Sequence, residues 1–179
     1  MKLSARRSLA VLVAGAALAT AGCGTSASGP DRAAVVDGTV ISQTDLRSAM
    51  KQVNAMDPAL LNSELTPSGT LTALIQAPVV IDFLAKKGVV VSDSVATHDA
   101  QSRGVKDPDD PTLEVVRLAT AIRAAQDSGK ITQEDGLALS KQLSEQKVVV
   151  NPRYGTFDPQ TASVSLTSPE WIRPATAAK

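Results

Sequence analysis

The chain offers few side chains that could do covalent or metal chemistry. Its 179 residues include one cysteine, Cys23, and one histidine, His98. These counts exclude an intrachain disulfide and a zinc cluster of several cysteines and histidines. His98 could act as a general base only with a positioned partner and a substrate pocket. We expect it instead to be a surface or capping histidine.

A local acidic cluster has the side chains that calcium prefers. It consists of Asp107, Asp109 and Asp110. The spacing lacks the glycine and the distal glutamate of an EF-hand loop. We therefore expect a solvated acidic loop and no metal site.

Serine nucleophiles and phosphate-binding loops are also without a motif. No Gly-x-Ser-x-Gly elbow surrounds Ser92, Ser94 or Ser102. Gly69 and Gly155 stand alone, so no glycine-rich loop is formed for a phosphate. The sequence predicts no catalytic residues, no cofactor and no enzymatic activity.

The N-terminal residues have the pattern of an export signal. Lys2, Arg6 and Arg7 precede an uncharged run from Leu9 to Ala21. This run is shorter than the roughly 20 residues that span a bilayer, so we expect cleavage rather than a retained anchor. The Arg6-Arg7 pair leaves twin-arginine export open beside the general secretory route.

The segment Ala19-Thr20-Ala21-Gly22-Cys23 resembles a bacterial lipobox. Ala21, Gly22 and Cys23 match that motif, whereas Thr20 stands where the family prefers Leu, Val or Ile. The resemblance implies that Cys23 receives a diacylglycerol and becomes the mature N-terminus. Two acyl chains suffice for stable anchoring, which places the protein on the extracytoplasmic face of the cell membrane.

The composition is that of a folded domain without affinity for nucleic acid. Hydrophobic residues make up 43% and charged residues 20%, as in ordinary soluble proteins. The 18 basic and 18 acidic side chains cancel, so no basic field attracts nucleic acid. Aromatic residues are only 2%, and the core must be built from aliphatic side chains.

Hydrophobic spacing predicts a mainly α fold with a small antiparallel sheet. Asp37-Gly38 is a hairpin turn signal between the apolar runs 34–36 and 39–41. Five helices are expected, and a strand at Val148–Val150 follows the last one. The expected helices extend from Ser42 to before Asp57, from Leu71 to about Lys87, from Ser92 to about Gln101, from Leu113 to Gln126 and from Thr132 to about Gln146.

Prolines and glycines predict the interruptions. Pro67, Ser68 and Gly69 are expected to break the chain before the second helix, and Pro78 to kink or restart it. The segment Arg103–Pro111 is expected to be a loop.

Three stretches in order resemble the N-terminal chaperone region of SurA-type proteins. The first is Val36-Asp37-Gly38-Thr39-Val40-Ile41 with the capped helix start at Ser42. The second is Leu84-Ala85-Lys86-Lys87-Gly88-Val89-Val90-Val91-Ser92-Asp93. The third is Val148-Val149-Val150-Asn151-Pro152-Arg153-Tyr154-Gly155, which resembles a return strand beside the hairpin. Asp37 stands where the family usually has Asn.

The resemblance implies a polypeptide-binding module without the parvulin prolyl isomerase that many members carry. That site resembles a cluster with two histidines, and this chain has only His98. The stretch between Gly88 and Val148 is predicted to form helices, without the strands that a parvulin sheet needs.

These observations predict four segments: a signal peptide over 1–22, a flexible tether over 23–32, a helical domain over 33–158 and an extended tail over 159–179. The expected partners are unfolded or exported polypeptides. The alternative is a scaffold lipoprotein that binds one defined cell-envelope protein. A broad apolar patch would favour many clients, and a small shaped one a single partner.

The C-terminal aromatic residues have two possible roles. Tyr154, Phe157 and Trp171 fall within the last 26 residues, where they could be recognition anchors or a satellite core. We expect core packing for Tyr154 and Phe157, and both roles stay open for Trp171.

Overall fold

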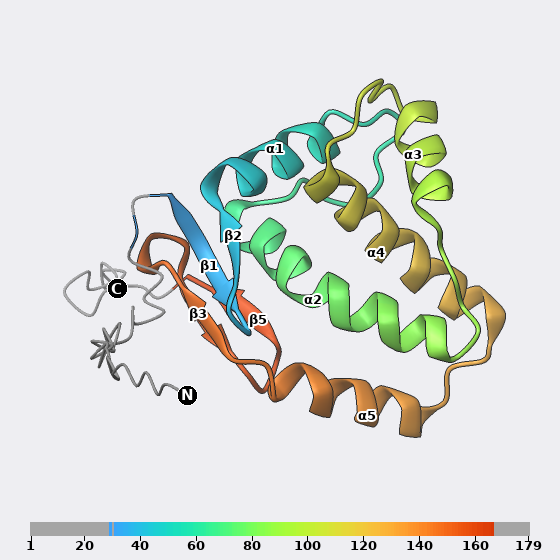
Figure 1. The fold of residues 1–179 in the computed structure, drawn as a ribbon. Coiled ribbons are helices and arrows are strands. Elements are labelled where there is room, and N and C mark those ends of the chain that lie inside the picture. Colours follow the sequence, from blue (N-terminus) through green and yellow to red (C-terminus); the bar gives the residue numbers. More distant parts are fainter. Residues whose placement is uncertain (1–28, 30, 167–179) are drawn as a thin grey trace, which may run out of the picture.

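The structure, a computed structural model, describes Gly29 and residues 31–166. Figure 1 shows a helical body with small sheets at one end. The helices are α1 (Gln43–Asn54), α2 (Pro67–Lys86), α3 (Asp93–Ser102), α4 (Asp110–Ser128) and α5 (Gln133–Ser144), with a short 3-10 helix at Pro152–Tyr154. The strands are β1 (Arg32–Val36), β2 (Thr39–Ser42), β3 (Val148–Val150), β4 (Thr156–Asp158) and β5 (Ser163–Ser165). The expected mainly α fold with a small antiparallel sheet is confirmed.

The three-stranded sheet joins the first strand of the described chain to a strand that follows the last α-helix. Its strand order is β2-β1-β3, and both pairings of β1 are antiparallel. Val35 is opposite Val40 on one side and opposite Val149 on the other. The predicted return strand therefore pairs with the N-terminal hairpin.

Helix α2 is the centre of the body. It contacts α1, α4, α5, β1 and β5 (Figure 1). By length and composition alone it could cross a membrane, but a large part of its surface is covered by these neighbours. Its buried face explains its apolar sequence, because a helix covered on several sides needs few polar residues.

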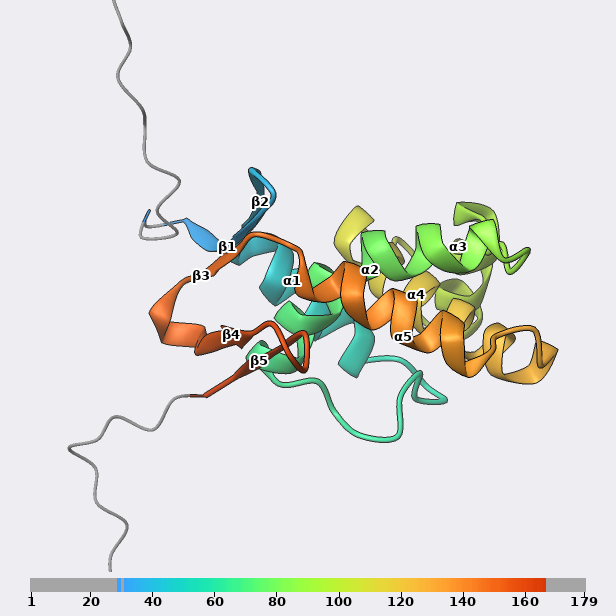
Figure 2. The ribbon, with the colours of Figure 1, turned by 90° about the horizontal axis from the view of Figure 1, so that it is seen from below.

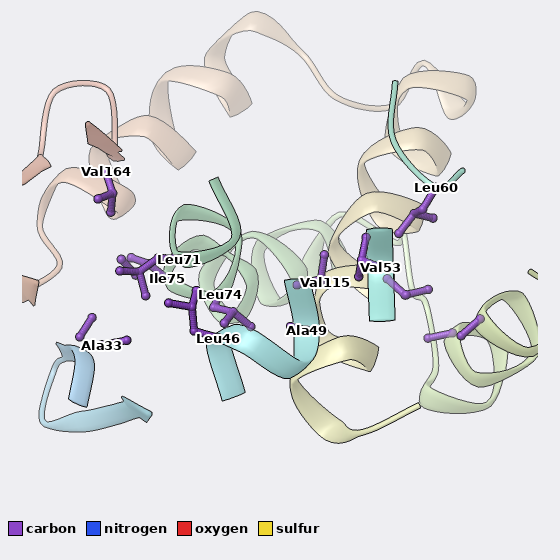
Figure 3. Close-up of a cluster of buried hydrophobic side chains, with 14 of the residues drawn as sticks. Ala33, Leu46, Ala49, Val53, Leu60, Leu71, Leu74, Ile75, Val115 and Val164 are labelled. Carbon is purple, nitrogen blue, oxygen red and sulfur yellow. The ribbon is translucent and has the colours of Figure 1, made fainter. Parts of the chain in front are cut away.

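The core is aliphatic and continuous from the sheets into the helices. Figure 3 shows Leu46 and Ala49 of α1 close to Leu74 of α2, with Val115 of α4 beyond them. Full burial of each such Leu, Ile or Val side chain contributes about 1.5–3 kcal/mol. Phe157 packs partly buried against the core, as does Tyr154, which confirms the predicted satellite packing. Trp171 lies outside the described residues.

Capping boxes are present at the starts of α1 and α5. Ser42 Oγ accepts a hydrogen bond from Asp45 N at 3.0 Å, and Asp45 accepts one from Ser42 N at 3.1 Å. Thr132 and Asp135 make the same reciprocal pair at the start of α5. These bonds satisfy backbone donors that would otherwise lack partners at a helix start.

An ion pair docks the start of α5 onto the end of α2. Lys87 Nζ lies 2.5 Å from Asp135 Oδ1. The hydrogen bond from Lys87, with bonds from Thr132, lowers the pKa of Asp135 to about 2. The ammonium also lies 5.7 Å from the centre of the Phe83 ring.

Three prolines behave differently from the prediction. Pro67 and Pro111 occupy the first turns of α2 and α4, where a missing backbone N–H costs nothing. The chain break predicted at residues 67–69 is therefore absent. The loop predicted over residues 103–111 ends before Pro111, because α4 begins at Asp110. Thr66 and Asp109 supply the N-caps. Of the two outcomes expected at Pro78, the restart is wrong, because α2 is one helix from Pro67 to Lys86, and the kink stays a prediction.

The folded part also continues past the boundary predicted at residue 158. Strand β5 pairs with β4, and Val164 is buried in the core. Val164 N donates a hydrogen bond to Thr72 Oγ1 at 2.9 Å, and Gln76 Nε2 donates one to the Ala162 carbonyl at 2.7 Å. Residues 159–166 are thus part of the domain rather than of an extended tail, and residues 167–179 lie outside the described part.

The close approach of β5 to Gly155 generates a stability prediction. Gly155 has φ +119°, and a Cβ there would lie 2.2 Å from the Ser165 carbonyl oxygen. We expect Gly155→Ala to lower the free energy of unfolding by at least about 2 kcal/mol, because strained backbone and a backbone clash combine. Thermal and urea denaturation would measure this change.

The matched control is Gly136→Ala in α5, where a Cβ meets nothing within 4 Å. This substitution should stabilise by about 0.5–1 kcal/mol through helix propensity. Unchanged stability of Gly155→Ala would contradict the placement of β5.

Candidate functional site

A groove of about 740 Å³ opens between the β1–β2 hairpin and the helices. Apolar side chains supply most of its walls. Its lining comes from the hairpin, α1, α2, the start of α4 and the second residue after α5: Val36, Asp37, Thr39, Val40, Ile41, Asp45, Leu74, Ile75, Pro78, Val79, Asp110, Pro111, Glu114 and Gln146. In Figure 2, β2 projects on the side of the body opposite β4 and β5.

The hairpin turn is fixed by its backbone conformation and by a link to β3. Asp37 and Gly38 have φ values of 48° and 90°. Positive φ at both central positions is the signature of a type I′ turn, which suits the twist of a two-residue hairpin. Asp37 Oδ1 accepts a hydrogen bond from Lys147 N at 3.0 Å. The hairpin turn at the rim of the groove is therefore held by a residue more than a hundred positions away in the sequence.

Strand β2 forms an open edge of the sheet beside the groove. Among the described residues it pairs with β1 alone, and the side chain of Val40 is 44% exposed. An edge strand presents backbone N–H and C=O groups that another extended chain can pair with. The groove thus combines apolar walls with a strand edge.

The proline in α2 changes the chemistry of the facing wall. Pro78 has no N–H, so the Leu74 carbonyl loses the bond that position 78 would otherwise donate. Leu74 and Pro78 both line the groove. Gln146 Nε2 donates to the next carbonyl, Ile75 O, at 3.3 Å. The Oε1 atom of Gln146 is buried without a hydrogen-bond partner in the described part of the chain.

The start of α4 is positioned by α1. Asp109 accepts hydrogen bonds from Thr112 N at 3.0 Å and from Ser48 Oγ of α1. Asp109 N also donates to Gln52 Oε1 at 3.3 Å. These bonds fix the first turns of α4, which carry Glu114 to the groove.

Glu114 is the most perturbed carboxyl group of the site. Burial raises its pKa above the ordinary value, and the charge of Arg117 opposes that shift only in part. Arg117 Nη1 makes its ion pair with Asp93, at 2.8 Å. Within residues 31–166, Glu114 has no ion-pair partner of its own. A desolvated, unpaired carboxylate in a groove is a candidate for binding a positive charge.

The candidates singled out from sequence do not meet at this groove. His98 is exposed on α3, as expected of a surface histidine. Of the acidic cluster, Asp107 is exposed, Asp109 caps α4 and only Asp110 lines the groove. Among the described residues, no group of three metal-binding side chains comes together.

The three serines have structural contacts instead. Ser92 caps α3 and lies 2.8 Å from the Ser94 hydroxyl, and Ser102 donates to the Asp99 carbonyl. Cys23, the predicted lipid attachment residue, lies outside the described part of the chain.

Sequence reasoning missed Glu114, Pro78 and Gln146 as parts of one site. In the sequence, Glu114 looks like an ordinary charged residue of a helix, Pro78 like a helix breaker and Gln146 like the end of a helix. A weak signal was available in Asp110 and Glu114, which are four residues apart and so share one face of α4. Nothing in the sequence places that face opposite the hairpin.

Comparisons with known proteins give no relative for this chain. No family model, no curated protein and no solved structure matches it. The function must therefore be argued from the groove itself.

The perturbed carboxyl group generates a pH prediction. Because the pKa of Glu114 is raised on folding, the folded state binds this proton more tightly than the unfolded state. The charged form thus costs stability at neutral pH, and the cost disappears at pH values below the unfolded pKa, 4.5. We expect Glu114→Gln to raise the free energy of unfolding at pH 7, by no more than about 1 kcal/mol for a partly exposed group.

The matched control is Glu134→Gln, an exposed glutamate in the first turn of α5. This variant should lower the free energy of unfolding by a few tenths of a kcal/mol, because an acidic side chain stabilises a helix N-terminus. Urea denaturation at pH 7 and pH 4 measures both changes. A Glu114→Gln protein less stable than the wild type at pH 7 would contradict the burial cost.

Proposed function

We propose that this protein is a lipid-anchored, extracytoplasmic protein that binds segments of unfolded or exported polypeptides in the groove. Binding is non-covalent and does not isomerise proline. The observation that supports the proposal is the position of an aliphatic groove of about 740 Å³ beside the open edge of β2.

An extended polypeptide has both features that such a groove recognises. Its backbone can add to β2 as a further strand, and its alternate side chains can bury against the wall of α2. The volume lies in the range of sites that enclose a small ligand, which corresponds to a short segment rather than a domain. Such contacts contribute about 25 cal/mol per Å² of buried apolar area before ordering costs, so binding to one segment is weak.

A second candidate is a scaffold that holds one defined cell-envelope protein. The compact groove favours it, since a small shaped site suits one partner better than a broad patch does. The other large apolar side chains exposed in the described part are dispersed over several elements, and include Val90, Val95, Ile122 and Leu137. The resemblance to SurA-type chaperone regions favours many clients instead.

The membrane anchor is tested on the protein extracted from bacterial membranes. Mass spectrometry of the N-terminal peptide should find Cys23 as the first residue, carrying a diacylglyceryl group. Replacement by Cys23→Ser should leave the chain uncleaved at this position. An unmodified Cys23, or cleavage elsewhere, would remove the anchor from the proposal.

Binding is tested on the detergent-extracted protein by suppression of client aggregation and by a prolyl cis/trans exchange assay. We expect suppression without catalysis. Val40→Gln should weaken binding about threefold to tenfold by removing apolar contact from the groove, whereas Val90→Gln, at an equally apolar exposed residue of the α2–α3 connection, should not. Strong prolyl catalysis would refute the non-enzymatic mechanism. No suppression, with one tight partner in a crosslinking pull-down, would favour the scaffold.

A further inference from the structure

We propose that the groove selects polypeptide segments in which a lysine or arginine stands among aliphatic residues, and that Glu114 receives the cationic side chain. This inference rests on the proposed function, because it names the class of segment that the same groove binds.

Charge complementarity is the first argument. All four charged side chains that line the groove are acidic: Asp37, Asp45, Asp110 and Glu114. They surround walls formed by residues such as Val40, Leu74 and Val79. An occupant that satisfies both parts must carry positive charge next to aliphatic surface.

The carboxylates differ in what they already bind. Asp37 accepts a hydrogen bond from the backbone of Lys147, and Asp45 accepts one from the backbone of Ser42. Glu114 has no ion pair among the described residues, and Arg117 is engaged with Asp93. Burial of an unpaired carboxylate lowers the stability of the folded state, and an ammonium or guanidinium group of a ligand offsets that loss by pairing with the carboxylate. Asp110 is exposed to solvent, whereas Glu114 is partly buried, so Glu114 is the carboxylate that gains most from a ligand.

A neutral acceptor in the wall of the groove suits the same kind of ligand. The Leu74 carbonyl lacks the N–H that a residue other than proline at position 78 would donate to it, and both residues line the groove. This carbonyl is left for another donor. A segment with a cationic side chain supplies donors from that side chain and from its backbone N–H groups.

The test uses a fluorescein-labelled peptide, Gly-Ser-Val-Leu-X-Val-Leu-Ser-Gly, in which X is lysine, glutamine or glutamate. Fluorescence anisotropy measures its binding to the full-length chain in detergent micelles, at about 0.15 M ionic strength. The lysine peptide should bind about fivefold to tenfold more tightly than the glutamine peptide, as expected for one partly buried ion pair. The glutamate peptide should bind most weakly.

Glu114→Gln should abolish the preference for the lysine peptide over the glutamine peptide. Glu134→Gln also removes one negative charge, but at the start of α5, about the length of that helix away from the groove residue Gln146. This variant should keep the preference for the lysine peptide. Equal loss in both variants would overturn the inference, since the effect would then come from net charge.

The remaining outcomes separate the two proposals. Equal binding of all three peptides by the wild type would overturn the cationic selectivity and leave polypeptide binding intact. No binding of any peptide would overturn the proposed function and the selectivity with it.

Discussion

The double pairing of β1 is the constraint on which the rest of the structure depends. An isolated two-stranded hairpin is at best marginally stable in water. Here β3 adds a third strand from the far end of the domain, with Val35 between Val40 and Val149. The link from Asp37 to Lys147 then holds the turn itself. Because the hairpin is one wall of the groove, the site exists only when sequence-distant segments have come together.

The opposite wall of the groove is formed by α2, and some of its apolar side chains belong both to the core and to the groove lining. Leu74 and Ile75 are both buried in the core and part of the groove lining. The apolar surface that holds the body together thus continues to the groove. Glu114 adds the opposing element, a carboxylate whose burial costs stability in the absence of a bound cation. Such a local cost is typical of a binding site, where stability is given up for recognition.

Much of the fold could be predicted because its signals are local. Capping boxes at Ser42 and Thr132, and the Asp37-Gly38 turn, are readable from a few residues each. The prolines at 67 and 111 were misread because a proline that stops one helix and a proline that starts the next look alike in sequence.

The β4–β5 pair and the groove were not predicted, for a different reason. Strand β5 is three residues long with one buried side chain, Val164, which is too short for a periodic pattern. The groove needs a hairpin, three helices and a residue that follows a fourth, and no local pattern encodes that arrangement. The lipid anchor at Cys23 and the resemblance to SurA-type chaperone regions stay predictions.

The most direct test of the binding site is nuclear magnetic resonance of the isotope-labelled protein in micelles, titrated with the lysine peptide. Amide and methyl shifts should move at Val40, Leu74 and Gln146, together with the amide of Glu114. Shifts confined to other exposed apolar positions, such as Leu137 on α5 or Val149 on β3, would contradict the groove as the binding site.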